Sequence, residues 1–363
     1  MKIPMFCVSI LAASLQLTLA GNPPAGVDGG AVAPHVMLAQ GDSAEMDLEC
    51  PGDPSRLVAA TIDGKSLEGG VRLEMVAANG PKNKVRLTTT PGAEPGVCRI
   101  GLKEDGKIKP LGYVDIVDKA AYGEFEAAAA KVKLPDGPVQ LLFLGDSLTD
   151  RNRGFNYADK VCFWLARNHP EGVRARNAGV GGDFTVRVWD RMNGVAGVHR
   201  PTDYDGIFDP PPQFVFVFLG QNDTKVHPST RYTLPMVSSD KFEETYRLIV
   251  QRLKEQTRAR IVLLSTASLV FEVQKEKADQ MRAQGKNHAL FGVSELLEKF
   301  NAVIKKLADE MSLGYVDVYE PTRRHPSKKQ LFVEDGVHVN NEGNRLIALE
   351  ILRYFAATSG DKI

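Results

Sequence analysis

The stretch Gln140–Thr149, with the sequence QLLFLGDSLT, decides the fold of this chain. Residues 141–144 form an unbroken apolar run, and such a run is typical of a buried parallel strand. The run ends at Gly145-Asp146-Ser147, and ligands of open α/β sheets bind at the carboxyl ends of the strands. Ser147 is therefore predicted to stand where a nucleophile is useful. A serine at this place is more often only the N-cap of the next helix, so other motifs must decide.

After about residue 120, apolar runs of strand length alternate with helical patterns. Alternation at this spacing predicts a parallel sheet with helices on both faces. We therefore expect a three-layer α/β/α sandwich over residues 120–363. The predicted strands are 139–144, 173–177, 214–219, 261–265 and 315–318, and the predicted helices are 120–133, 157–168, 184–192, 242–256, 293–311 and 341–356.

The N-terminus predicts export. Residues 1–20 contain one early lysine, a short apolar stretch and small residues before Gly21, which is typical of a secretory signal peptide. A membrane anchor is the competing interpretation, but the stretch is short for a membrane span. Residues 21–34 are rich in Gly, Pro and Ala and predict a flexible leader. We expect a secreted or periplasmic protein.

Residues 35–119 predict a small, immunoglobulin-like β-sandwich, because short alternating runs are separated by turn signals. A binding module and a structural appendage both fit this region. An oxidising compartment favours a disulfide between Cys50 and Cys98, although the sequence leaves their pairing open. Cys162 lies among apolar residues and is expected to be a buried thiol.

Composition argues against several partners. The 363 residues contain 45 Lys and Arg against 45 Asp and Glu, so no global basic field attracts nucleic acid or anionic lipid. The His and acidic residues show no spacing typical of metal ligands. We expect no metal, no organic cofactor and no stable membrane insertion, and the oligomeric state is open.

Three further motifs follow predicted strands or precede the last helix. Asp335 stands three residues before His338, where it could orient an imidazole that takes a proton from Ser147. Gly182 could bring a backbone N–H to a developing oxyanion, and Asn222 could add a side-chain amide. Each motif alone has a plain structural alternative, namely a turn former for Asp335 and Gly182 and a cap for Asn222.

Four blocks, taken in order, resemble the SGNH or GDSL-type hydrolases: Gly145-Asp146-Ser147-Leu148, Asn177 to Asp183, Gly220-Gln221-Asn222-Asp223, and Asp335-Gly336-Val337-His338. The resemblance covers residues 120–357 and implies the flavodoxin-like five-stranded sheet of that family. It also implies Ser147 as nucleophile, His338 as general base and Asp335 as its partner. The implied oxyanion hole is formed by Ser147, Gly182 and Asn222.

The resemblance implies an esterase that works through an acyl-serine, but it permits many esters. Export, a β module and the lack of a long apolar lid favour a carbohydrate O-acetylesterase. The alternatives are a lysophospholipase or short-chain esterase and, in another class, a catalytically silent carbohydrate-binding protein. Residues 201–212 and 225–239 are predicted to shape the pocket, with His227, Arg231 and Tyr232 as possible contacts, and 272–288 is predicted to be a solvated helix.

Overall fold

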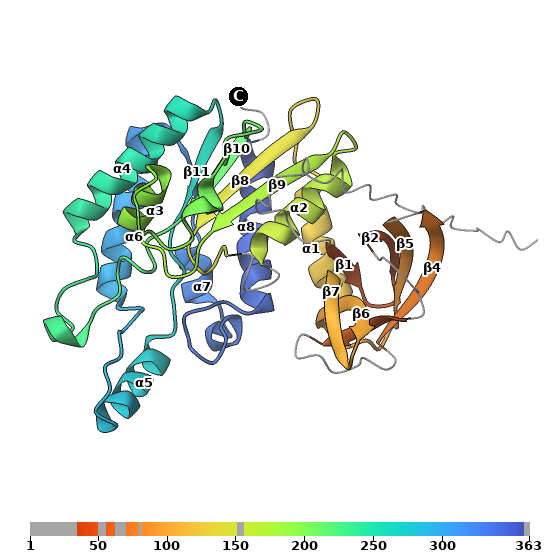
Figure 1. Cartoon of the computed structure of the whole chain (residues 1–363), viewed down its shortest axis with the longest axis horizontal. Coiled ribbons are helices and arrows are strands. Elements are labelled where there is room, and N and C mark those ends of the chain that lie inside the picture. The colour runs from red at the N-terminus through yellow and green to blue at the C-terminus, as the bar shows by residue number, and fades with distance from the viewer. Residues whose placement is uncertain (1–34, 50–55, 62–69, 80–81, 151–155, 359–363) are drawn as a thin grey trace, which may run out of the picture. The chain divides into compact units, whose positions relative to one another are not determined.

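A computed structural model describes residues 35–49, 56–61, 70–79, 82–150 and 156–358. The predicted signal peptide and leader, residues 1–34, lie outside the described residues. Leu38–Asp118 form one compact unit, and the chain from Lys119 onward belongs to a second (Figure 1). Among the described residues, none of the helices combines the length and apolar character needed to cross a bilayer.

The first unit is a sandwich of a four-stranded sheet, in the order β1-β7-β6-β3, and a three-stranded sheet, β2-β5-β4. The second to seventh strands occupy the places of strands B to G in an immunoglobulin domain, whose sheets contain B-E-D and C-F-G. The predicted all-β fold is therefore confirmed. The strands are β1 (His35–Ala39), β2 (Ser43–Glu49), β3 (Leu57–Thr61), β4 (Val71–Asn79), β5 (Lys82–Thr89), β6 (Gly96–Glu104) and β7 (Lys107–Val117).

Cys98 corrects the expectation of a disulfide. Its thiol is free and buried in β6, where Sγ lies 3.6 Å from the Val114 carbonyl oxygen. Burial, and then the nearby Asp115 carboxylate, raise the pKa of Cys98 to about 12. Its expected partner, Cys50, lies outside the described residues. Cys162 is a buried free thiol, as predicted.

The second unit contains a five-stranded sheet in the order β12-β11-β10-β8-β9, with parallel pairing throughout. Numbered from β8, this order is 2-1-3-4-5, which is the flavodoxin-like order expected. The strands are β8 (Val139–Gly145), β9 (Val173–Gly179), β10 (Phe214–Phe218), β11 (Arg260–Leu264) and β12 (Gly314–Val316).

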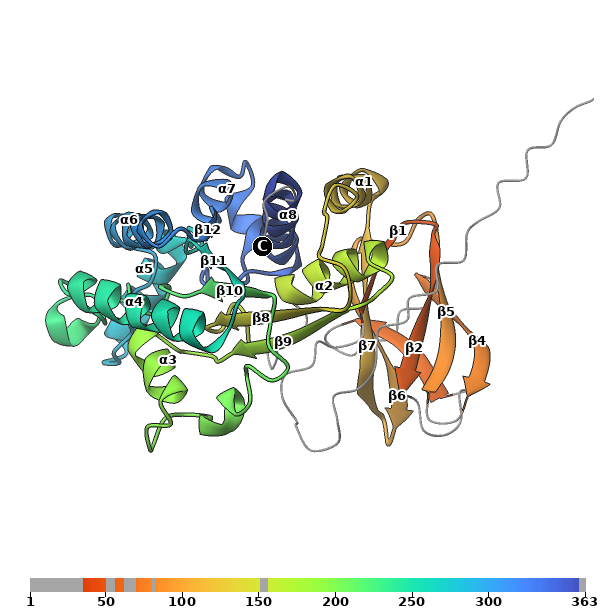
Figure 2. The same ribbon diagram turned by 90° about the horizontal axis from the view of Figure 1, so that it is seen from above.

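Helices cover both faces of this sheet (Figure 2). On one face, α3, α4 and α6 pack in a single core with alternate strand residues such as Leu142 and Val215. On the other face, the rings of Phe143 and Phe216 lie near Tyr157 of α2 and Phe355 of α8. The helices are α1 (Lys119–Ala129), α2 (Tyr157–Asn168), α3 (Thr185–Met192), α4 (Ser239–Gln256), α5 (Phe271–Ala283), α6 (Ser294–Glu310), α7 (Tyr319–Arg324) and α8 (Asn341–Thr358).

The edge strand β12 is shorter than the predicted 315–318. The Ser265 hydroxyl donates to Asp317 and accepts a hydrogen bond from the Val318 N–H at 2.8 Å. These contacts turn the chain out of the sheet and into α7, a short helix that the sequence pattern did not predict.

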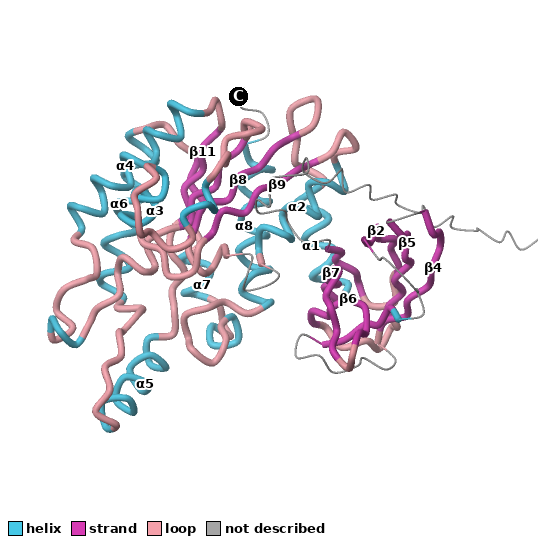
Figure 3. Tube along the Cα trace, viewed as in Figure 1, coloured by secondary structure: helices cyan, strands magenta, loops and turns pink. Residues whose placement is uncertain are grey.

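The strand order reverses between β8 and β10, and their carboxyl ends lie side by side because Gly145 pairs with Phe218. Loops that follow the strands gather beyond this end of the sheet (Figure 3). Such a switch point is where open α/β sheets bind ligands. The fold therefore brings the segments after Gly145 and Phe218 to one place.

Candidate active site

Ser147 stands on a tight turn directly after β8. The Asp146 side chain accepts the Leu148 N–H at 2.9 Å, and its backbone oxygen accepts the N–H groups of Thr149 and Asp150. Gly145 is required here, since a Cβ on it would lie 2.1 Å from the Thr149 hydroxyl oxygen. Ser147 is partly exposed although the residues on each side of it are buried. The turn thus presents one hydroxyl to the loop region.

The structure brings Ser147, His338 and Asp335 into one hydrogen-bonded chain. His338 Nε2 lies 2.8 Å from Ser147 Oγ, and His338 Nδ1 lies 2.6 Å from Asp335 Oδ2. The carboxylate on the Nδ1 side assigns the proton to Nδ1, which leaves Nε2 free to accept the serine proton. The three side chains therefore have the geometry of a nucleophile, a base and an orienting acid.

Asp335 is held as a carboxylate by its own loop. Its Oδ1 accepts the N–H groups of Val337 and His338 at 2.8 and 2.9 Å. Burial acts to raise the pKa of Asp335, but the hydrogen bonds from the His338 side chain and from the two backbone N–H groups outweigh it and hold that pKa well below its ordinary value. The base therefore has a charged partner at neutral pH.

Two backbone donors lie ready for an oxyanion. Among the described residues, the N–H groups of Ser147 and Gly182 have no hydrogen-bond acceptor. Gly182 has a φ of +81°, a conformation that favours glycine, and it is partly exposed. A Cβ on the neighbouring Gly181 would lie 4.0 Å from the Ser147 Cβ, so the glycine loop packs directly beside the serine.

Asn222 lies beside the glycine loop, but its side-chain amide already donates two hydrogen bonds. Its Nδ2 donates to the Asp183 carbonyl oxygen at 2.9 Å and to Asp146 Oδ2 at 3.3 Å. An oxyanion contact would replace the longer of these hydrogen bonds. Burial raises the pKa of Asp146 to about 7. The role of Asn222 in the oxyanion hole therefore stays a prediction.

Buried carboxylates that sequence reasoning did not assign tie the loops together. Asp183 pairs with Arg191, and both side chains are fully buried. Asp223 Oδ1 accepts the backbone N–H of Thr185 at 3.0 Å and its hydroxyl at 2.6 Å. Both aspartates sit inside the motifs, and their position beside Gly182 and Asn222 is the signal that could have indicated them. The contacts of Asp223 fasten the start of α3 to the loop after β10, and the Asp183–Arg191 pair holds the start of α3 to its last turn.

Helix α5 supports the loop that contains Asp335. The Gln274 amide donates to the Asp335 carbonyl oxygen, and the Val270 N–H donates to the Gly336 carbonyl oxygen at 2.8 Å. Most of α5 is exposed, as predicted for residues 272–288, but Gln274 is 2% exposed. No local pattern marked Gln274, because its partner lies 61 residues away.

Three residues of segment 225–239 were predicted as substrate contacts, and each lies in a different environment. The Tyr232 hydroxyl donates to the His288 carbonyl oxygen at 3.2 Å, and Tyr232 packs on the small cluster formed by Val226, Ala278 and Leu290. Tyr232 therefore fastens this segment to α5. Arg231 is exposed, and His227 caps a short 3₁₀ helix by its backbone.

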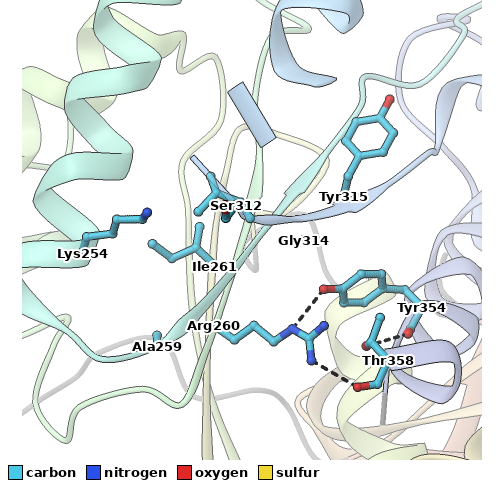
Figure 4. A pocket seen from close by; sticks show the side chains of 10 residues that line it. Lys254, Ala259, Arg260, Ile261, Ser312, Gly314, Tyr315, Tyr354 and Thr358 are labelled. Atoms are coloured by element: carbon cyan, nitrogen blue, oxygen red, sulfur yellow. Dashed lines mark hydrogen bonds between the residues drawn. The ribbon is translucent and has the colours of Figure 1, made fainter. Parts of the chain in front are cut away.

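A separate pocket of about 350 Å³ opens at the other end of the sheet, where β11 and β12 begin (Figure 4). The Arg260 side chain in this pocket is paired: its guanidinium donates to the Tyr354 hydroxyl at 3.1 Å and to the Thr358 carbonyl oxygen at 3.3 Å. In the described part of the chain, no cluster of three or more His, Cys, Asp or Glu side chains is suited to a metal ion.

Comparisons with known proteins find relatives of part of this chain. A curated relative, the GDSL esterase/lipase WDL1 of Oryza sativa subsp. japonica, is 23% identical over 151 residues, which are 41% of this chain and 56% of the relative. The match thus spans about half the length of that relative.

Solved structures that are similar to part of this chain include a lipase/acylhydrolase from Enterococcus faecalis and a mutant of the acetylxylan esterase Axe2 from Geobacillus stearothermophilus. The first is 18% identical, with a TM-score of 0.46 over 60% of this chain and 96% of that one. The second is 22% identical, with a TM-score of 0.44 over 61% and 96%.

The model of the GDSL-like Lipase/Acylhydrolase family matches residues 143–346, more than half of the chain. This stretch begins in β8, just before Ser147, and extends past His338 into α8. The match confirms the resemblance expected from the four motifs and the enzyme class that it implied. The α/β domain is that of an ester hydrolase with a serine nucleophile, and the chain belongs to the GDSL-like lipase/acylhydrolase family.

Proposed function

We propose that the protein is an exported serine esterase that removes O-acetyl groups from carbohydrates. The observation that carries ester hydrolysis is the hydrogen-bonded chain Ser147–His338–Asp335, with distances of 2.8 and 2.6 Å. Export rests on the sequence of residues 1–20. A protein that only bound carbohydrate would have no physical reason to keep this geometry.

In the proposed reaction, His338 Nε2 takes the Ser147 proton while Oγ attacks the ester carbonyl carbon. The N–H groups of Ser147 and Gly182 hold the oxyanion, with Asn222 as the third predicted donor. When the intermediate collapses, the bond to the sugar oxygen breaks and that oxygen takes the proton from His338. Water then attacks the acetyl-serine in the same way, which releases acetate and restores the Ser147 hydroxyl.

Polar side chains on the loops beside Ser147 support a carbohydrate as the alcohol. Asp150 Oδ2 accepts the Gly181 N–H at 2.7 Å and pairs with Arg200 at 2.7 Å. Arg187 donates to the Gly182 carbonyl oxygen at 3.3 Å. Hydroxyl-rich substrates bind to such donors and acceptors, whereas an acyl chain needs a continuous apolar surface.

One observation favours a short-chain esterase or lysophospholipase as the second candidate. Leu234 and Met236 are 60% and 43% exposed on the segment that follows Asn222. Exposed apolar side chains beside a site can cover an acyl chain.

Two ester substrates separate these candidates. We expect the mature protein to hydrolyse p-nitrophenyl acetate faster than p-nitrophenyl octanoate and to release acetate from acetylated polysaccharides. Ser147→Ala should abolish both activities. A preference for octanoate would move the assignment to lipid esters. Equal turnover by Ser147→Ala would overturn the serine mechanism, and secretion of the full chain by its native host would test export.

A further inference from the structure

The predicted oxyanion donor Gly182 lies in a tight turn. The Asp183 N–H donates to the Val180 carbonyl oxygen at 3.1 Å and closes the turn, and Gly182 has a φ of +81°. A φ of this size at the third residue is that of a type II turn. The two central residues, Gly181 and Gly182, have no Cβ, so the backbone itself restricts the peptide group between them very little. Contacts from outside the turn must therefore fix the direction of the Gly182 N–H.

Asp150 supplies one such contact. Its Oδ2 accepts the Gly181 N–H at 2.7 Å, and Asp150 is only 4% exposed. This hydrogen bond fixes the peptide group that precedes Gly181, and Arg187 fixes the one that follows Gly182 by donating to its carbonyl oxygen at 3.3 Å. A Cβ on Gly181 would lie 3.2 Å from Asp150 Oδ2 and 4.0 Å from the Ser147 Cβ. The carboxylate thus contacts the turn directly beside the nucleophile.

Arg200 holds the Asp150 carboxylate in place. Its Nη1 donates to Asp150 Oδ2 at 2.7 Å, and its Nη2 lies 2.5 Å from Asp203 Oδ2. The Arg200 carbonyl oxygen accepts a hydrogen bond from Arg191 Nε at 3.2 Å, and Arg191 is paired with the buried Asp183. Because Asp183 is the last residue of the turn, these contacts form a closed chain that leads from the turn back to it. Hydrogen bonds between charged groups are stronger than neutral ones, which suits them to hold a glycine-rich turn.

We infer that Asp150, with Arg200 as its counter-ion, is a positioning residue of the oxyanion hole. By accepting the Gly181 N–H, the Asp150 carboxylate directs the Gly182 N–H toward the ester oxygen. This inference rests on the ester hydrolysis in the proposed function, but it is the same for a sugar ester and a lipid ester. The negative charge on the ester oxygen develops only in the transition state, so a misdirected donor lowers kcat and leaves KM nearly unchanged.

The kinetic test compares three variants on p-nitrophenyl acetate, with rates expressed per mole of folded protein. Asp150→Ala removes the acceptor, so kcat should fall about 10- to 100-fold, less than for loss of an oxyanion donor itself, with KM nearly unchanged. Asp150→Asn keeps an oxygen that can accept the Gly181 N–H, so it should recover most of the lost kcat. The control is Asp203→Asn, which changes the other carboxylate bound to Arg200 and should leave kcat within about twofold of the wild type.

The counter-ion is tested by a double-mutant cycle. Arg200→Gln should lower kcat about threefold to tenfold, and Arg200→Lys should restore part of it. In the Asp150→Ala background, Arg200→Gln should cause no further loss, because both residues act through the same hydrogen bond to Gly181. Losses that add in the double variant would overturn the role of Arg200 as the counter-ion of Asp150.

Amide hydrogen exchange tests the position of the turn without any turnover. In Asp150→Ala, the peptide that contains Gly181 and Gly182 should exchange faster than in the wild type, while peptides from α4 should not. Unchanged exchange of the turn, or equal losses of kcat in Asp150→Ala and Asp203→Asn, would overturn the inference. A wild type that hydrolyses no ester would remove the proposed function, and the exchange of the turn would then decide by itself whether Asp150 holds it.

Discussion

The two ends of the parallel sheet both carry polar side chains, yet they differ in how those groups are used. At the end where β11 and β12 begin, Arg260 is bound by Tyr354 and Thr358, and Lys254 donates to the Met311 carbonyl oxygen at 2.8 Å. At the carboxyl end, the described N–H groups of Ser147 and Gly182 are unpaired. Paired groups stabilise a fold, whereas positioned but unpaired donors keep their binding capacity for a ligand.

Of the substitutions that test this difference between the two ends of the sheet, the one at Asp335 should reduce kcat the most. Asp335→Asn keeps the size of the side chain but removes the charge and favours the wrong histidine tautomer, so kcat should fall by about 10⁴-fold. Steady-state kinetics on p-nitrophenyl acetate measure the loss. Glu334→Gln is the matched control, because Glu334 is the exposed neighbour of Asp335. A loss below tenfold for Asp335→Asn would show that the carboxylate does not orient His338.

A substitution of Asn222 tests whether an amide that already donates hydrogen bonds can also bind the oxyanion. If the amide exchanges its 3.3 Å contact with Asp146 for the oxyanion, Asn222→Ala should reduce kcat by about 10²- to 10³-fold. The control is Asn193→Ala, which removes an exposed amide bound to the Trp189 carbonyl oxygen. A variant that loses stability but keeps its kcat would assign Asn222 a purely structural role.

A smaller effect is expected at Gln274, which acts on Asp335 only through its backbone. Gln274→Leu removes the donor to the Asp335 carbonyl oxygen, so kcat should fall by about threefold to tenfold with little change in KM. Gln280→Leu changes an exposed glutamine on the same helix and serves as control. Equal kcat values for the two variants would show that α5 does not position the Asp335 loop.

The features that could be predicted from the sequence are those that a short segment of the chain determines by itself. The apolar run before Gly145 was sufficient to place β8, and the spacing of Asp335 and His338 predicted a contact that the structure confirms at 2.6 Å. The alternation of strands and helices predicted the layers, because burial of a sheet on both faces leaves a local apolar signal.

Features that depend on distant partners were not predicted. Gln274 reaches a residue 61 positions away, and Thr185 meets Asp223 across 38 positions. The short helix α7 depends on contacts made by Ser265 from β11. Such contacts are set by tertiary packing, so no periodic pattern in the chain records them.

The smallest effect on activity is expected at the end of the sheet where the cations Arg260 and Lys254 are paired. Arg260→Gln removes donors to Tyr354 and Thr358, so the free energy of unfolding should fall by about 1–2 kcal/mol. The value of kcat/KM should stay within about twofold of the wild type, because no group of the Ser147 site contacts this pocket. Chemical denaturation and steady-state kinetics on the same preparation measure both quantities. A folded variant with a large loss of kcat/KM would mean that the two ends of the sheet are coupled. Whether a polar group is paired would then not tell a structural residue from a functional one.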